Sequence, residues 1–264
     1  MYNDKKIALI IPTRYNSERL NGKVLCDIAG KKQIEWIIER ASQSKYIDRI
    51  ILAVSDKEYI PILKWFHCEN KNKNVFYFSG SHHNIIQRCL DAANFHNIDI
   101  IVDVSHDCTF FDPYLADLLI ERLFEYNADY SANCITRSFP DGFDIQVYTI
   151  QIYQEIYNTN KYINYYSGWN IWHCREEIFP KPKIINLEAE KEYYYPHWHL
   201  CLDTEEDKTV IEKIIIEGFK NDSFRFPYKH NQLNYWRIIN FLEKHPEILE
   251  INKSVIPTKL LEEN

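Results

Sequence analysis

The chain has 264 residues, and 31 lysines and arginines against 38 aspartates and glutamates give it a net charge of −7. Its hydrophobic fraction of 45% and charged fraction of 26% are those of a globular protein, which excludes a disordered or low-complexity chain. The sequence contains no long basic run, so it lacks the positive field with which proteins collect nucleic acids. We therefore expect any anion site to be local and no nucleic-acid partner.

The apolar run near the N-terminus covers residues 7–11 and ends at Pro12. It is too short for a signal-peptide core or a membrane span, so we expect a cytoplasmic protein with no membrane partner. The seven cysteines are scattered singly and form no C-x-x-C pair. This pattern predicts reduced, mostly buried thiols rather than a zinc ribbon or a redox motif.

The first half of the chain alternates between two kinds of apolar pattern. Ile- and Val-rich runs at residues 7–11, 50–54, 75–78 and 100–104 predict buried strands. Helical spacing appears at residues 34–41, 60–66, 85–95 and 115–124. Asp112-Pro113 provides an N-cap and a first-turn proline, so this last helix is expected to run to about residue 126. Strands that alternate with helices predict an α/β fold with a mainly parallel sheet.

The second half is less regular. Residues 130–135 predict a strand, and after a turn the alternating residues 143–150 predict an edge or antiparallel strand. Residues 152–197 are dense in Tyr and Trp and weakly periodic, which indicates an insertion that covers one face of the sheet. Residues 199–202 predict a short strand, and helices are expected from Asp203-Thr204 to about 217 and over about 232–244. We expect one domain over residues 1–228, with residues 229–264 packing on it as a helix and tail.

Ligands of open α/β sheets bind beyond the carboxyl ends of the strands, where loops and helix N-termini present free amides. The loop after the first strand carries Arg14, Ser17, Arg19 and Lys23. Three cations and a hydroxyl suit a polyphosphate clamp, since guanidinium forks and lysine charges match phosphate oxygens. The alternative is a solvated basic loop with Glu18 as counterion. The loop matches neither GxxxxGK[ST] nor GxGxxG, so a Walker A ATPase and a Rossmann dehydrogenase lack support.

Two aspartates follow predicted strands. Asp107 comes just after the strand at 100–104, and Asp203 follows the strand at 199–202. Carboxylates opposite a polyphosphate are suited to hold Mg²⁺, which prefers hard oxygen ligands. Asp203 has a second interpretation as the N-cap of the helix that follows it. Asp103 lies four residues before Asp107, inside the strand, and need not share its site.

Other polar groups give weaker indications. Asp141 and Asp144 flank Gly142 in a Pro-Asp-Gly turn. His197 and His199 would share one face of a strand, but two imidazoles do not make a zinc site. The sequence contains no G-x-S-x-G nucleophile motif.

Four segments, taken in order, resemble the CTP-dependent sugar cytidylyltransferases, the group containing the CMP-Kdo and CMP-sialic acid synthetases. IPTRYNSERLNGKVL is similar to IPARxxSxRLPGKVL, and DIIVDVSHDCTFFDP to DxVVRVTGDCPLIDP. FPDGFDIQVY is similar to PDGLDVEVF, and LCLDTEEDKTVI to LTVDTPEDLELI. The last two point to the subgroup of spore-coat polysaccharide biosynthesis type. The resemblance covers residues 7–150 and 199–215.

The resemblance implies a Rossmann-like nucleotide-diphospho-sugar transferase fold and a homodimer. It also implies attack of a sugar-like acceptor on the α-phosphorus of CTP, with Mg²⁺ as cofactor, release of pyrophosphate and a role in surface polysaccharide synthesis. The implied catalytic residues are Arg14, Lys23 and Asp107, and the implied metal ligands are Asp107 and Asp203. Nucleotide binding is implied for Pro12, Thr13, Arg14, Ser17, Arg19, Lys23, Ser105 and Asp107. Acceptor binding is implied for His106, Asp141, Asp144 and Gln146.

The chain departs from the family pattern where the acceptor is concerned. His106 replaces a glycine, Thr109 and Asn21 replace prolines, and Gln146 replaces an acidic residue. His106 either narrows the pocket and adds a donor or general base, or belongs to a locally adapted loop. These changes suggest an acceptor unlike a standard nonulosonic acid.

Three alternatives stay open. One is a nucleotidyltransferase with another base or a phosphorylated acceptor, and another is a catalytically silent nucleotide-sugar binding protein. A glycosyltransferase would carry a D-x-D motif, which the spacing of Asp141 and Asp144 does not supply. Aromatic residues near the C-terminus suit either a dimer surface or a core: Tyr228, Tyr235, Trp236 and Phe241.

Overall fold

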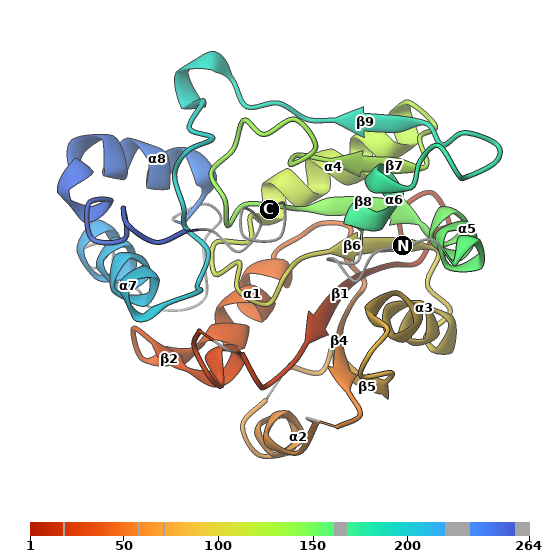
Figure 1. Cartoon of the computed structure of the whole chain (residues 1–264), viewed down its shortest axis with the longest axis horizontal. Coiled ribbons are helices and arrows are strands. Elements are labelled where there is room, and N and C mark those ends of the chain that lie inside the picture. Colours follow the sequence, from red (N-terminus) through yellow and green to blue (C-terminus); the bar gives the residue numbers. More distant parts are fainter. Residues whose placement is uncertain (18, 58, 71, 161–167, 220–232, 257–264) are drawn as a thin grey trace.

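The computed structural model describes residues 1–256 apart from positions 18, 58, 71, 161–167 and 220–232. Within these ranges a seven-stranded sheet has the order β5-β4-β1-β6-β8-β7-β9 (Figure 1). Its strands are β1 (Ile7–Thr13), β4 (Arg49–Ser55), β5 (Val75–Gly80), β6 (Ile100–Asp103), β7 (Tyr130–Ala132), β8 (Gln146–Thr149) and β9 (Ile184–Asn186). A separate antiparallel pair consists of β2 (Asp27–Ile28) and β3 (Lys31–Lys32).

Helices cover both faces of the sheet. They are α1 (Gln33–Ala41), α2 (Tyr59–Cys68), α3 (Ile85–Phe95), α4 (Pro113–Glu125), α5 (Ile150–Thr159), α6 (Trp169–His173), α7 (Glu205–Phe219) and α8 (Tyr235–Lys244), with short 3₁₀ turns η1 (Lys23–Leu25), η2 (Lys191–Tyr193) and η3 (Pro246–Ile248). Among the described residues, no helix combines the length and apolarity that crossing a membrane would require.

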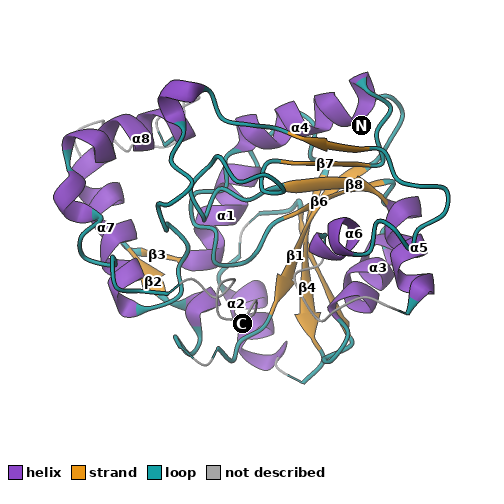
Figure 2. Ribbon diagram, turned by 45° about the horizontal axis from the view of Figure 1, so that its top comes forward, coloured by secondary structure: helices purple, strands orange, loops and turns teal. Residues whose placement is uncertain are grey.

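The alternation of side chains along β1 explains the two cores. Ile7, Leu9 and Ile11 join the apolar cluster that contains α1, α2, α4, α7 and α8, whereas Ala8 and Ile10 join the cluster of α3, α5 and α6. Figures 1 and 2 show α7 and α8 side by side at one end of the molecule. The fold class predicted from the sequence, an α/β protein with a mainly parallel mixed sheet in one domain, is confirmed.

The strand predicted over residues 143–150 is antiparallel, as expected, but it is not an edge strand. It is shortened to β8, which runs antiparallel to β6 on one side and β7 on the other. Ile150 already begins α5, where the Thr149 side chain caps the helix by accepting from the Ile152 amide. The edge position belongs to β9, which pairs parallel with β7.

The prediction for residues 152–197 as a separate covering insertion is therefore wrong in part. Helix α5 packs beside α3 on one face, where the fully buried Tyr153 lies 4.9 Å from the ring of Tyr148. The same segment also extends the sheet itself through β9, which weak periodicity did not reveal because only three residues form it. Residues 161–167 lie outside the described ranges.

The short strand predicted over residues 199–202 does not form. A single parallel bridge joins Asp141 and His199 instead, with the Asp141 amide donating to the Trp198 carbonyl and the Leu200 amide donating to the Asp141 carbonyl. Gly142, at φ 109°, turns the chain away immediately afterwards, so no ladder continues.

The C-terminal helix begins at Tyr235, because the Asn234 side chain accepts from the Arg237 amide. Tyr235 is buried against Phe139 and Phe143, which favours the core interpretation of this aromatic residue. Helix α8 packs on α7. Tyr228, residue 232 and the predicted boundary between residues 228 and 229 lie outside the described ranges, so the boundary stays a prediction.

Gly142 provides a stability test. A β-carbon there would lie 2.6 Å from the Leu200 carbonyl carbon and oxygen, in a backbone conformation that L-residues avoid. We expect Gly142→Ala to lower the free energy of unfolding by about 2 kcal/mol or more. Gly30→Ala is the matched control, since Gly30 also has a positive φ, but among the described residues nothing beyond its two chain neighbours lies within 4 Å of the added β-carbon. If urea unfolding showed equal losses of unfolding free energy in the two variants, the close approach of residue 142 to the Leu200 carbonyl group would be contradicted.

Candidate active site

The loop after β1 buries a lysine. Gly22 has φ 69°, its amide donates to the Tyr15 carbonyl at 3.0 Å, and an added β-carbon would meet the Tyr15 ring at 3.2 Å. The turn leads directly into η1, whose first residue is Lys23. As a result, Lys23 leaves a surface loop and places its side chain in the interior, where it is 4% exposed.

The Lys23 ammonium lies between two carboxylates. Its Nζ donates to Asp107 Oδ2 at 2.8 Å and to Asp203 Oδ1 at 3.0 Å. Burial alone would lower the pKa of Lys23, but the charges of Asp107 and Asp203 raise it above its ordinary value. The lysine is therefore charged at neutral pH.

Asp107 lies in the loop after β6, at the same sheet edge as the loop after β1. Burial would raise the pKa of this carboxyl, but the adjacent Lys23 charge holds it below its ordinary range, so Asp107 is ionised. The Leu202 amide donates to the Asp107 carbonyl at 3.0 Å. This backbone bond joins the Asp107 loop to the segment that carries Asp203.

Asp203 does not cap α7. The Thr204 amide donates to Asp207 Oδ2 at 2.8 Å, and the Asp207 amide donates to Thr204 Oγ1 at 3.3 Å, which is a reciprocal capping arrangement. The N-cap interpretation of Asp203 is thus wrong, because Thr204 fills that role. The Asp203 carboxylate instead binds Lys23 and the guanidinium of Arg19, whose Nη2 lies 2.7 Å from Asp203 Oδ2.

A buried histidine stands behind these carboxylates. His199 Nδ1 lies 3.1 Å from Asp141 Oδ2, and its Nε2 lies 3.5 Å from Asp207 Oδ1 and 3.8 Å from Asp203 Oδ2. Burial would lower the pKa of His199, but the hydrogen bond to Asp141 and the nearby Asp207 carboxylate raise it to about 10. His199 is therefore an imidazolium that offsets the surrounding acidic charge.

Sequence reasoning assigned no such role to His199 or Asp207. It placed His199 on a strand beside His197, yet His197 is exposed and only His199 is buried. The signal available in the sequence was Thr204 three residues before Asp207, the spacing of a capping box.

His106 is buried at the end of β6. Its Nδ1 lies 3.1 Å from the Pro12 carbonyl, which can only accept, so Nδ1 carries the proton and Nε2 the lone pair. Burial, together with the nearby Lys23 charge, lowers the pKa of His106 to about 4. Nε2 has no hydrogen-bond partner among the described residues. His106 is thus a neutral acceptor rather than a donor.

The other residues predicted to bind the acceptor have internal partners. Both guanidinium Nη atoms of Arg137 donate to the Asp144 carboxylate, at 3.0 and 2.8 Å. Gln146 Oε1 accepts from the Tyr130 hydroxyl at 2.5 Å, and Asp141 pairs with His199. Of these three residues, only Asp141 is linked to the charged cluster, through His199, and the role of all three in acceptor binding stays a prediction.

The remaining residues of the predicted phosphate clamp are spread out. Arg14 is exposed, Ser17 is partly exposed, and Thr13 Oγ1 donates to the Ile11 carbonyl at 2.8 Å. Ser105 precedes Asp107 by two residues and hydrogen-bonds to its carboxylate. The structure thus brings together Arg19, Lys23, Asp107 and Asp203, with Arg14 and Ser17 in the loop after β1 and Thr13 at the end of that strand. Asp103 is apart from them, accepting from the Gly168 amide at 2.7 Å and the Tyr148 hydroxyl at 3.1 Å.

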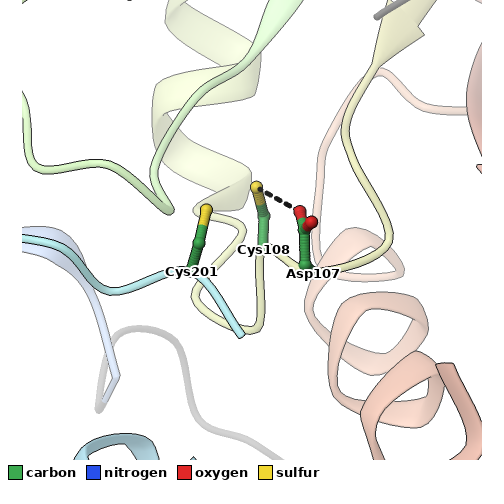
Figure 3. A group of neighbouring side chains, drawn as sticks. All are labelled: Asp107, Cys108 and Cys201. Atoms are coloured by element: carbon green, nitrogen blue, oxygen red, sulfur yellow. Dashed lines mark hydrogen bonds between the residues drawn. The ribbon is translucent and has the colours of Figure 1, made fainter. Parts of the chain in front are cut away.

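The donor set around Asp107 discriminates between metals. Figure 3 shows Asp107, Cys108 and Cys201 gathered at one point, with one potential ligand atom from each lying within 4.8 Å of the others. A hydrogen bond with Cys108 and burial raise the pKa of the Cys201 thiol well above its ordinary value, so it stays protonated. Mg²⁺ prefers oxygen to sulfur. The two carboxylates that share Lys23 fit Mg²⁺, whereas the thiols do not.

A further polar pair lies at the ends of β4 and β5. Ser55, the last residue of β4, is buried, and its hydroxyl lies 2.7 Å from His82 Nδ1. Because β4 neighbours β1, this pair lies at the same sheet edge as the loop that carries Lys23. Sequence reasoning did not connect the two residues, which are 27 positions apart.

Comparisons with known proteins find a matching family and similar sequences. The sequence model of the family described as cytidylyltransferase matches residues 8–240. The protein MJ1063 of Methanocaldococcus jannaschii is 28% identical over 254 residues, 95% of this chain and 96% of that protein. The spore coat polysaccharide biosynthesis protein SpsF of Bacillus subtilis is 27% identical over 79% of this chain and 85% of its own. A 3-deoxy-manno-octulosonate cytidylyltransferase of Photobacterium profundum is 26% identical, over 68% and 69%.

A solved structure supports the match over nearly the whole chain. The structure of a cytidylyltransferase from Leptospira borgpetersenii has a TM-score of 0.77 and 27% sequence identity. The match covers 93% of this chain and 97% of that one. Lys23, Asp107 and Asp203 all lie inside the sequence match, which covers residues 8–240.

The charged cluster around His199 predicts a pH-dependent stability. A histidine whose pKa rises from 6.5 to about 10 on folding contributes stability that is fully present below pH 6.5 and is lost as the pH rises through about 10. We expect His199→Gln to lower the unfolding free energy by about 3–5 kcal/mol at pH 6, measured with chelator present, and the deficit to shrink towards pH 10.

The matched control is His197→Gln, the same substitution at an exposed histidine two residues away. Its unfolding curve is expected to follow that of the unsubstituted protein at every pH. A deficit in His199→Gln that stays constant between pH 6 and 10 would contradict the imidazolium assignment.

Proposed function

Since this chain belongs to the cytidylyltransferase family and is a CTP-dependent nucleotidyltransferase, we propose that it transfers CMP from CTP to a sugar or acidic sugar, with release of pyrophosphate. The observation that carries the proposal is the buried Lys23 ammonium shared by Asp107 and Asp203 at the edge of the sheet. This cluster combines a cation for phosphate with two carboxylates for a divalent metal.

The loop after β1 is proposed to bind the triphosphate. The side chains of Lys23 and Arg19 lie against the carboxylates of Asp107 and Asp203. Exposed Arg14 and partly exposed Ser17 lie in the same loop. Arginine forks and a lysine charge match phosphate oxygens, and binding them lowers the negative charge that opposes attack on the α-phosphorus. Because phosphoryl-type transfer depends mainly on positioning and charge neutralisation, these side chains account for much of the expected rate enhancement.

Asp107 and Asp203 are proposed to hold Mg²⁺. Their carboxylates approach the same nitrogen from two different loops, so a cation is already favoured at that point. Bound Mg²⁺ would supply charge neutralisation on the triphosphate and on the departing pyrophosphate. The protein groups supply the rest: they orient the triphosphate, keep both carboxylates ionised and exclude water.

The acceptor is proposed to be sugar-like. Names of the matched relatives support this class, since one contains spore coat polysaccharide biosynthesis and another names 3-deoxy-manno-octulosonate. The Nε2 lone pair of His106 is unpaired among the described residues but buried, so the role of His106 in acceptor binding stays a prediction. A role in surface polysaccharide synthesis follows from the same support.

Two alternatives concern the substrates. The first is a nucleotide with a different base. The Ser55 and His82 pair could contact a base at the ends of β4 and β5, but it does not by itself select cytosine over another base. The second is a phosphorylated acceptor, which is compatible with the same basic loop.

A third alternative is a silent nucleotide-sugar binding protein, which would keep the charged cluster but lack turnover. The homodimer, the cytoplasmic location and the acceptor residues Asp141, Asp144 and Gln146 stay predictions.

The proposal is tested by pyrophosphate release. CTP, UTP, ATP and GTP are each incubated with Mg²⁺ and with single sugars, sugar acids and their phosphates. We expect release with CTP and a sugar or sugar acid, and loss of that release when Mg²⁺ is chelated. Release with another nucleotide would indicate a different base, and release only with a phosphorylated sugar would indicate a phosphorylated acceptor. Nucleotide binding without release would indicate the silent binding protein.

Asp107→Asn is the variant that tests the metal assignment. Removing this charge is expected to lower pyrophosphate release at least about a hundredfold, because the triphosphate then lacks its neutralising cation. Circular dichroism is expected to be unchanged. Asp91→Asn, the same substitution on the exposed surface of α3, is the matched control and is expected to keep full activity. Undiminished release by Asp107→Asn would contradict the assignment.

A further inference from the structure

The chain returns to the site after the region matched by the family. The match ends at residue 240, inside α8, and the segment that follows passes through η3 towards the loop that carries Asp203. Its last described residue, Ile256, accepts a hydrogen bond from Arg19 through its carbonyl at 2.9 Å. A part of the chain outside the family match therefore contacts the candidate site.

Asn252 makes the closest approach. It is 4% exposed, and its Nδ2 donates to the His199 carbonyl at 2.9 Å and to Asp207 Oδ1 at 2.8 Å. Both amide hydrogens are thus used, one on each side of Asp203 in the sequence. A buried amide with both donors satisfied in this way fixes the geometry of the groups that accept from it.

The second oxygen of Asp207 transmits this constraint to Asp203. Asp207 Oδ2 accepts from the Asp203 amide at 3.1 Å and from the Thr204 amide at 2.8 Å. Asn252 therefore orients the Asp207 carboxylate, and that carboxylate in turn holds the Asp203 backbone amide. It also fixes the backbone of His199, whose ring lies 3.8 Å from the Asp203 carboxylate.

We propose that Asn252 is a positioning residue for Asp203, through which the C-terminal segment sets the affinity of the site for its divalent cation. This inference rests on the proposed role of Asp203 as a metal ligand. Asn252 bonds to Asp207 and to the His199 carbonyl, and so acts on Asp203 through them. Partners that orient a metal-binding carboxylate commonly change metal affinity by tenfold to a hundredfold when they are lost.

A purely structural role for Asn252 makes a different prediction. If the residue only anchors the C-terminal segment, its loss lowers stability without changing metal affinity in the folded protein. If it positions Asp203, its loss weakens the metal selectively, and saturating metal restores turnover.

The test uses the full chain and Mn²⁺, which accepts the same oxygen ligands as Mg²⁺ and is detected by electron paramagnetic resonance. The variants are Asn252→Ala and Asn252→Leu, the latter similar in size to asparagine but without donors or charge. We expect Mn²⁺ affinity in the presence of CTP to fall about tenfold or more in both variants. We expect kcat to approach that of the unsubstituted protein at saturating Mg²⁺, with the KM for CTP then little changed.

Two controls separate the effect from a general disturbance of the segment. Asn240→Ala makes the same substitution at an exposed position of α8, and Lys253→Ala alters the neighbouring residue, whose ammonium pairs with Glu250. Both are expected to keep the Mn²⁺ affinity of the unsubstituted protein.

The outcomes distinguish this inference from the proposed function. If Asp203→Asn leaves Mn²⁺ binding intact, the metal assignment fails. If Asp203→Asn abolishes binding while Asn252→Ala and Asn252→Leu keep full affinity, the positioning role is overturned. Should Asn252→Ala not fold, the better-packed Asn252→Leu decides. Should both variants bind poorly but gain no turnover at saturating metal, the selective effect is absent and the inference is also overturned.

Discussion

The rest of the site depends on one constraint, which is that a buried ammonium needs buried counter-charges. Lys23 is 4% exposed, and its Nζ is shared by Asp107 and Asp203, which lie 84 and 180 positions further along the chain. Removing one member of such a cluster leaves an uncompensated charge in a medium that solvates it poorly. The three loops that carry these residues are therefore held together by mutual charge neutralisation, at the edge of the sheet where a polyphosphate is expected to bind.

Further polar and charged side chains support this cluster from the start of α7 and from the C-terminal segment. Thr204 and Asp207 cap α7, so the Asp203 carboxylate is not used as a helix cap. Asn252 donates a hydrogen bond to Asp207. His199 as an imidazolium offsets the acidic charge of Asp141 and Asp207. The same carboxylates that neutralise Lys23 are the proposed ligands of Mg²⁺. On the proposed function, Asp107 and Asp203 would hold Mg²⁺ in place of the Lys23 ammonium, and Lys23 would then be available to a phosphate oxygen.

Local sequence patterns predicted most of the framework. Four Ile- and Val-rich runs became β1, β4, β5 and β6, and the Asp112-Pro113 start of α4 is confirmed by the Asp112 carboxylate, which accepts from the Tyr114 amide at 2.9 Å. The position after a strand also placed the Lys23 loop and Asp107 opposite each other at the predicted polyphosphate site, although it did not predict the ion pair between Lys23 and Asp107. Specific side-chain partners were not predictable in this way. The pairings of Asp144 with Arg137, Gln146 with Tyr130 and Asp141 with His199 depend on turns and bridges that leave no periodic signal. Strand β9 is too short to show one, and Asn252 is one of several polar residues in the C-terminal segment, beside Lys253 and Ser254.

The exchange of partners at Lys23 is the central claim, and the Mn²⁺ affinity of the protein without CTP tests it most directly. In Lys23→Met the aliphatic stem is kept and the ammonium is removed, so two buried carboxylates are left without their cation. The account predicts that this variant binds Mn²⁺ at least about tenfold more tightly than the unsubstituted protein, because the metal no longer competes with a positive charge at the same point. An unchanged or weaker affinity would contradict the claim that lysine and metal share the two carboxylates.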